Sequence, residues 1–112
     1  MFDGLWVIEF ETGLGYGSGV LVFNGNQVLG GDFGYYYFGR INTTGNLSGE
    51  VNVVRFDPNA SSVFGNHDNF TLLLKDGTIN ETSFKASAIV KGTEDFSVEV
   101  KGKKKVDTDE AS

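Results

Sequence analysis

The sequence predicts an all-β protein, an antiparallel up-and-down barrel of about eight strands in one domain of residues 1–101. Apolar side chains recur at every second position, and turn residues separate the apolar runs at short intervals. The 16 glycines and the single proline also indicate many tight turns. A chain of short strands must hide its sheet edges, and a closed barrel does so. A two-sheet sandwich is the alternative, but the abundant hairpin turns favour the barrel.

Each expected strand has an apolar face. The first strand shows this most clearly, because Trp6, Ile8 and Phe10 fall on one side of an extended chain and Glu9 and Glu11 fall on the other. The later strands repeat the alternation with aromatic and β-branched residues, which strands favour. The expected strands cover residues 5–12, 16–23, 26–30, 35–41, 50–56, 69–75, 82–91 and 95–101.

Turn residues connect these strands. Asn24-Gly25 is the strongest hairpin signal, and it predicts a type I′ turn with positive φ at both residues. Gly30, Gly31 and Asp32 are expected to form the structural turn before the tyrosine-rich strand, because glycine and aspartate favour chain reversal. Asp76-Gly77 predicts a further turn at the end of a later strand.

Two segments depart from the strand pattern. Asp57-Pro58 supplies a helix N-cap followed by proline at the first helical position, so one short helix is expected over residues 59–64. Residues 102–112 combine lysines with acidic residues and have almost no apolar side chains. We therefore expect a charged, disordered C-terminal tail over these residues, and a basic peptide-binding tail is the alternative.

The inward faces of the expected strands define a barrel lining. An eight-stranded barrel can leave room for one small apolar ligand, although a solid core is the default for so many large side chains. The lining, and with it any ligand cavity, is expected to consist of Trp6, Ile8, Phe10, Tyr37, Ile41, Val51, Val53, Phe70, Leu72, Leu74, Phe96, Val98 and Val100.

The strand YYYFGRI, residues 35–41, is aromatic on both faces. Alternation places Tyr37 on the lining and places Tyr36, Phe38 and Arg40 on the opposite face. Exposed apolar patches often mark partner sites. Tyr36, Phe38 and Arg40 are therefore the candidate face for a partner or a second subunit.

Two glycine-rich runs resemble phosphate sites but lack the required context. Asp32-Phe33-Gly34 matches the magnesium-binding tripeptide of protein kinases, yet the chain is too short for a kinase and has no matching catalytic loop. GLGYGSGV, residues 13–20, leads into an apolar strand, whereas a dinucleotide-binding loop opens a helix. Glycines in this run are expected to permit a bulge or the close approach of another backbone.

The sequence offers few residues for catalysis, metal binding or nucleic-acid binding. There are no cysteines, and the one histidine, His67, lies in a polar stretch typical of a solvated loop. Asp32, Asp57 and Asp76 each have a turn or cap role, so a metal site built on them is disfavoured. A net charge of −6 opposes direct binding to nucleic acid. We expect neither enzymatic activity nor a cofactor.

The start of the chain resembles neither an export signal nor a membrane anchor. MFDGLWVIEF has no positively charged segment followed by a long apolar run, and no later stretch resembles a membrane span. The expectation is therefore a cytoplasmic protein without a membrane partner.

The order of motifs resembles the GrlR family, small bacterial regulators linked to type III secretion. Gly30-Gly31-Asp32 followed by a tyrosine strand and Gly39 is the most specific element, and the resemblance covers nearly all of residues 3–101. The matching segments are DGLWVIEF (3–10), SGVLVFNGNQVLGGD (18–32), YYYFGRI (35–41), GEVNVVRF (49–56), SVFG (62–65), NFTLLL (69–74) and EDFSVEVK (94–101).

The resemblance implies a lipocalin-like, eight-stranded barrel with a short helix, commonly a homodimer. It also implies a negative regulator of transcription that binds and sequesters a transcriptional activator. In the family, acidic residues in the loop after the tyrosine strand are important for that contact. Here residues 42–48 contain no acidic residue, so the resemblance transfers the fold better than the partner.

Two functional hypotheses follow. The first is a dimeric protein-interaction module that modulates a transcriptional activator, motivated by the resemblance and by the second aromatic face. The second is a binder of a small apolar or lipid-like ligand inside the barrel. The two hypotheses differ in what binds to the chain, which is a protein in the first and a small apolar ligand in the second.

Overall fold

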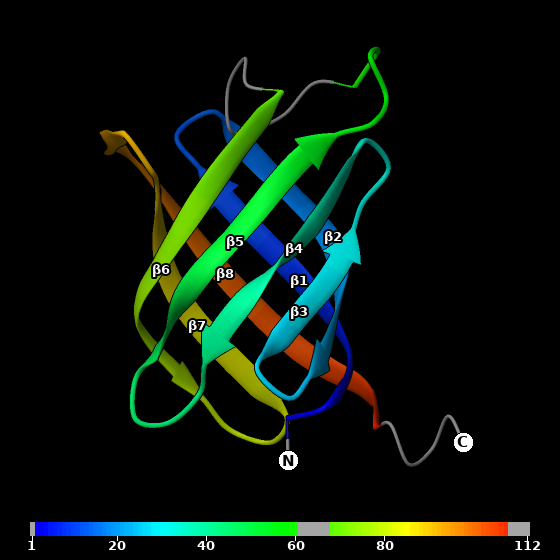
Figure 1. Ribbon diagram of the computed structural model, residues 1–112, viewed down its shortest axis with the longest axis vertical. Coiled ribbons are helices and arrows are strands. Elements are labelled where there is room, and N and C mark those ends of the chain that lie inside the picture. The colour runs from blue at the N-terminus through cyan, green and yellow to red at the C-terminus, as the bar shows by residue number, and fades with distance from the viewer. Residues whose placement is uncertain (1, 61–67, 108–112) are drawn as a thin grey trace.

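A computed structural model describes residues 2–60 and 68–107, and its strands close into one antiparallel barrel in sequence order (Figure 1). The all-β, eight-stranded, up-and-down barrel predicted from the sequence is thereby confirmed, and the sandwich alternative is wrong. The strands are β1 (Gly4–Thr12), β2 (Gly15–Asn24), β3 (Gln27–Gly31), β4 (Tyr35–Asn42), β5 (Leu47–Arg55), β6 (Asn69–Ile79), β7 (Ser83–Val90) and β8 (Thr93–Asp107).

The last strand closes the barrel and extends further than the sequence predicted. β8 continues to Asp107, and its C-terminal half pairs with the start of β1, where Ile8 lies opposite Gly102 and Trp6 opposite Lys104. Residues 102–107, expected to belong to a disordered tail, are therefore strand. The physical reason is closure, because β1 would otherwise present unpaired backbone groups along half its length.

The first hairpin turn lies one residue later than predicted. Asn24 and Gln27 still pair across β2 and β3, so the two central residues are Gly25 and Asn26. Only Gly25 of the two has positive φ, at 62°. Positive φ at the first central residue alone is the pattern of a type II′ turn rather than type I′, and both types suit the twist of a hairpin.

The other predicted turns also move. Gly30 and Gly31 are the last residues of β3, and they pair with Tyr37 and Tyr36 of β4, so the reversal itself occurs over residues 32–34. Asp76-Gly77 is not a turn but an irregularity inside β6, where the pairing with β7 shifts between Lys75 and Thr78. Asp76 has a φ of 53°, which fits a bulge that re-aims the strand.

No helix occurs within residues 2–60 and 68–107. Of the helix predicted over residues 59–64, Asn59 instead lies in a turn, and its backbone N–H bonds the Asp57 carboxylate at 2.9 Å. Residues 61–64, together with His67, lie outside the described part. Asp57 therefore acts as a turn residue, since its side chain caps the N–H two residues further along.

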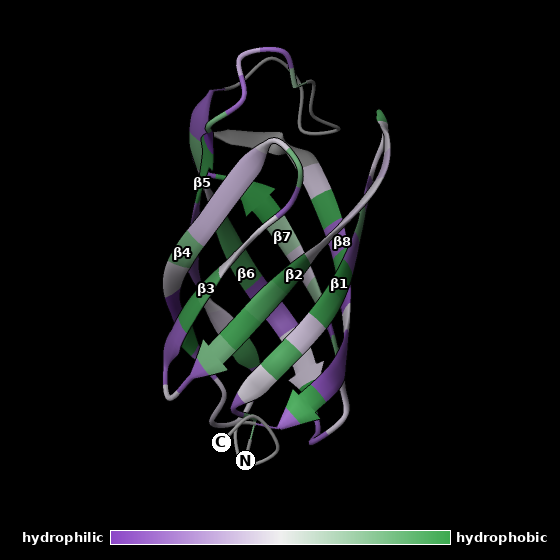
Figure 2. Cartoon of the chain, turned by 90° about the vertical axis from the view of Figure 1, so that its right-hand side faces the viewer, coloured by the Kyte–Doolittle hydropathy of each residue, from purple (hydrophilic) through white to green (hydrophobic). Residues whose placement is uncertain are grey.

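The core fills the inside of the barrel and follows the period-two pattern. Figure 2 shows hydrophobic bands alternating with paler or hydrophilic bands along β1, whereas the second half of β2 is continuously hydrophobic. At one end Trp6, Phe23 and Phe84 pack edge to face or tilted, with ring centroids 5.2–6.0 Å apart. The predicted lining residues whose side chains are described are all buried: Trp6, Ile8, Phe10, Tyr37, Ile41, Val51, Val53, Phe70, Leu72, Leu74, Val98 and Val100. Phe96 lies in β8, and its side chain is outside the described part.

Glycines at the start of β2 have no side chain and so leave space for large aromatic rings in the core. The ring of Phe10 occupies the place that a side chain at Gly17 would need. A Cβ at Gly19 would lie 3.0 Å from the Tyr37 hydroxyl and 2.9 Å from the Gly31 carbonyl oxygen. The run GLGYGSGV therefore allows close packing inside the barrel wall.

Candidate functional site

The barrel interior is a packed core with little free space. A cavity of about 50 Å³ remains, and pockets for drug-sized ligands are about 300–1,000 Å³. Among the described residues, no Asp, Glu, Lys, Arg, Asn, Gln, His, Ser or Thr side chain is buried, and the hydroxyl of the buried Tyr37 already bonds Asp32. The cavity is lined by Ile8, Phe10, Leu21, Tyr37, Ile41, Val51, Val53, Leu72, Leu74, Phe84 and Val100.

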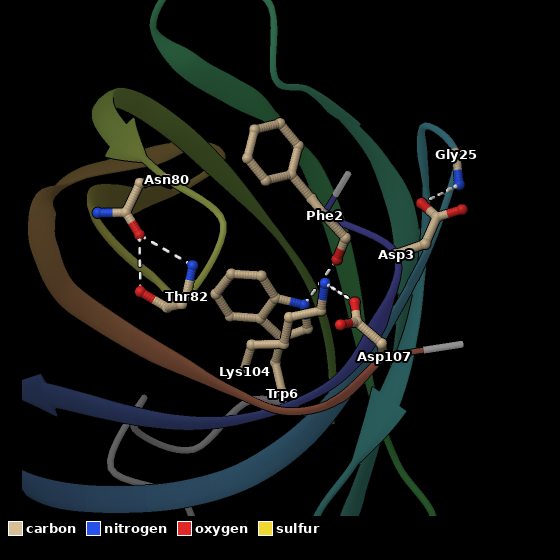
Figure 3. Close-up of polar contacts among 8 residues, drawn as sticks. All are labelled: Phe2, Asp3, Trp6, Gly25, Asn80, Thr82, Lys104 and Asp107. Carbon is tan, nitrogen blue, oxygen red and sulfur yellow. Dashed lines mark hydrogen bonds and ion pairs between the residues drawn. The ribbon is translucent and has the colours of Figure 1, made fainter. Parts of the chain in front are cut away.

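One end of the barrel is closed by the first residues of the chain. The Trp6 indole N–H donates a hydrogen bond to the Phe2 carbonyl oxygen at 2.8 Å, and the Phe2 side chain packs against the core (Figure 3). The Asp3 carboxylate accepts a bond from the Gly25 N–H at 2.9 Å, which ties this segment to the β2–β3 turn. These contacts hold the N-terminal segment across this end of the core.

Asp32 anchors the turn that resembled a kinase magnesium site. Its Oδ1 accepts hydrogen bonds from the backbone N–H groups of Gly34 and Tyr35, both at 2.9 Å. Its Oδ2 accepts a hydrogen bond from the Tyr37 hydroxyl. Burial, reinforced by this hydrogen bond, raises the pKa of Tyr37 well above its ordinary value. The carboxylate is thus occupied by the β3–β4 connection, while Phe33 of the same tripeptide is largely exposed.

The outer surface of β1–β5 carries a continuous group of apolar side chains. Strand register places them in two rows that run across neighbouring strands, and most are at least one-third exposed. We call this group the outer apolar face. It comprises Leu5, Val22, Leu29 and Phe38 in one row, and Val7, Val20, Tyr36 and Val54 in the other, where Gly31 of β3 lies between Val20 and Tyr36.

The predicted partner residues lie on this face or at its border. Tyr36 and Phe38 are 46% and 42% exposed, and their rings stack with centroids 6.1 Å apart. Leu29 lies opposite Phe38 on β3 and is 54% exposed. Arg40 follows on the same side of β4, opposite Glu50 of β5, and forms a charged border.

Alternation along one strand found Tyr36 and Phe38 but missed their neighbours. Sequence spacing shows which residues of a strand share a face, but it gives no information on which residues lie beside them in the next strand. The one available signal was the stretch from Val20 to Phe23, which is apolar on both faces. That pattern places Val20 and Val22 outside when Leu21 and Phe23 fill the core.

No known protein family matches this chain, and no curated protein has significant sequence similarity to it. Among the described residues, no helix is long and apolar enough to cross a membrane. Within the same residues, no three His, Cys, Asp or Glu side chains are grouped so that they could hold a metal ion.

Proposed function

We propose that this protein is a non-enzymatic regulator that acts by binding another protein through the outer apolar face. The observation that carries the proposal is the size and continuity of that face. Six of its side chains are 36–54% exposed, and contiguous apolar patches of more than a few hundred Å² often mark interaction sites. The stacked aromatic rings of Tyr36 and Phe38 on β4 are the kind of anchor that dominates binding energy in protein interfaces.

The expected partner is a transcriptional activator that the protein sequesters. This part of the proposal rests on the resemblance of the motif order to the GrlR family. The loop between β4 and β5 lacks the acidic residues through which that family contacts its partner. The apolar face would therefore replace the acidic loop as the main contact.

The alternative of an apolar ligand inside the barrel receives no support from the interior. A fatty acid or a similar molecule needs several hundred Å³, and the core leaves about 50 Å³. Binding such a molecule would require displacing several large side chains from a close-packed core, which costs stability.

A paired-variant capture experiment tests the proposal. Tagged wild type is compared with Leu29→Ser/Phe38→Ser, which removes the centre of the face, and with Thr71→Ser, a conservative change on β6 outside it. We expect wild type and Thr71→Ser to capture one DNA-binding activator from cells of the source organism. The double variant should bind that activator at least about tenfold more weakly than wild type does.

A reporter gene controlled by the captured activator supplies the functional readout. Its expression should rise when the double variant replaces wild type, because the activator is no longer held. Equal capture by all three proteins, or capture of no DNA-binding protein, would contradict the proposal. Light scattering of the same samples tests the expected homodimer, whose mass would be about twice the 12.1 kDa of one chain.

A further inference from the structure

A second surface feature lies beside the outer apolar face, on the outside of β7 and β8. It is a hollow of about 670 Å³ bordered by four lysines, which we call the lysine hollow. Lys85 comes from β7, and Lys101, Lys103 and Lys105 come from β8. All four side chains are exposed.

The arrangement of these lysines is electrostatically unfavourable in the free protein. Lys85 and Lys101 lie directly opposite each other on adjacent antiparallel strands, and like charges in that relation are destabilising. Lys103 follows Lys101 on the same side of β8. The chain has only nine lysines and arginines and a net charge of −6, so four cations around one hollow are a strong local concentration.

Little within the protein neutralises this charge. Among the side chains of residues 2–60, 68–92 and 97–107, no ion pair involves Lys85, Lys101, Lys103 or Lys105. Glu9 is the one carboxylate that lines the hollow, opposite Lys101 on β1. Its carboxylate also interacts with the hydroxyl of Tyr16 on β2 and thereby raises the pKa of that tyrosine. The hollow therefore carries an excess of positive charge.

We propose that the lysine hollow binds an acidic segment of a protein partner, in extended conformation, along β8. Lys101 and Lys103 are two residues apart on one strand, about 7 Å. Carboxylates at alternate positions of an extended peptide have the same spacing. Thr78 also lines the hollow, and its hydroxyl can bond to the backbone of such a segment, whereas the Asn80 side-chain oxygen and the Ser83 hydroxyl bond each other.

The surroundings of the hollow favour a peptide over other anions. Its four lysine side chains are exposed to solvent, whereas small-molecule sites use a few fixed polar groups in an apolar pocket. A nucleic acid would extend past the lysines onto a protein of net negative charge, which repels it. Val7 lines the hollow and also belongs to the outer apolar face, so one partner can contact both surfaces. The identity of that partner rests on the proposed function. The inference that the bound segment is acidic is independent of the proposed function.

Fluorescence anisotropy with a defined probe tests the hollow by itself. The probe is a short fluorescein-labelled peptide of alternating glutamate and alanine, titrated at low ionic strength. We expect Lys101→Gln/Lys103→Gln to weaken binding about tenfold. The matched control is Lys75→Gln/Lys91→Gln, which removes two exposed lysines outside the hollow and should weaken binding less than about twofold.

Several outcomes would overturn the inference. No wild-type binding at low salt, an equal loss in both double variants, or equal binding of a glutamine–alanine peptide would each do so. Displacement of the probe by inorganic tripolyphosphate at far lower concentration than by unlabelled glutamate peptide would assign the hollow to a small anion instead. Leu29→Ser/Phe38→Ser should bind the probe as tightly as wild type. A failure of the proposed function can therefore be distinguished from a failure of the lysine hollow to bind acidic peptide.

Discussion

The Tyr37 side chain is buried in the core, and its hydroxyl donates a hydrogen bond to a carboxylate. Changing either feature usually lowers the stability of the fold. A hydrogen bond to a charged group contributes about 1.5–3 kcal/mol. We expect Tyr37→Phe to lower the free energy of unfolding at pH 7 by about this amount, measured by urea denaturation. Tyr36→Phe is the control, because the Tyr36 side chain lies half-exposed on the outer face.

The same residue makes stability depend on alkaline pH. The pKa of Tyr37 is raised in the folded state, so its contribution is fully present below pH 10.0, the ordinary pKa of tyrosine. Above that pH the unfolded chain loses the phenol proton and the folded chain retains it, so the free energy of unfolding falls as pH rises. Tyr37→Phe should show a shallower decline above pH 10 than wild type. An unchanged slope would contradict this assignment.

Residue identity alone predicted the roles of some side chains and not of others. Alternation identified the buried face of each strand, because a half-buried strand leaves a period-two pattern in its sequence. Asp32 was expected to form a turn, and it does, but its bond to Tyr37 depends on how the barrel wall brings the two together. The lysine hollow was not predicted, since Lys101 was expected to end the last strand and Lys103 to lie in a disordered tail.

At the level of elements, the local turn signals predicted that tight turns connect the strands, but they placed several of these turns at the wrong residues. Asp76-Gly77 has the composition of a hairpin turn, yet β6 continues through it because Gly77 pairs with Leu47 of β5, and Thr78 and Ile79 pair with β7. The turn itself falls at Asn80, whose side chain accepts bonds from the N–H groups of Thr82 and Ser83, both at 2.9 Å. Figure 3 shows the bond from Thr82. Tertiary pairing decides which of two adequate turn sequences is used.

The pairing of β7 with β8 gives a prediction that links stability to function. Lys85→Gln removes one of two like charges that face each other and keeps Lys101, which also lies opposite Glu9 on β1. Relief of such a pair stabilises by about 0.2–1 kcal/mol. We expect the melting temperature to rise in low-salt buffer and the gain to shrink in high salt. Lys75→Gln/Lys91→Gln should leave it nearly unchanged. A fall in melting temperature would show that the facing lysines do not repel each other in the folded state.

For the whole molecule, closure of the barrel depends on the half of β8 that the sequence assigned to a tail. A chain of residues 1–101 lacks the partners of Gly4 to Ile8 on β1. It also uncovers Trp6 and Phe84, and exposing each large apolar side chain costs about 1.5–3 kcal/mol. Together with the unpaired backbone groups, this loss is comparable to the total stability of a small domain, about 5–15 kcal/mol.

We therefore expect residues 1–101 to lose cooperative thermal unfolding and to aggregate through the open edges of β1 and β7. Near-ultraviolet circular dichroism reports the loss through the Trp6 environment, which is fully buried in the closed barrel. The control is a chain of residues 1–107, which keeps every pair between β1 and β8 and should melt like wild type. If residues 1–101 instead unfold cooperatively at the wild-type temperature, the pairing of residues 102–107 contributes nothing to the fold. The strand that carries Lys103 and Lys105 would then not be needed for barrel closure.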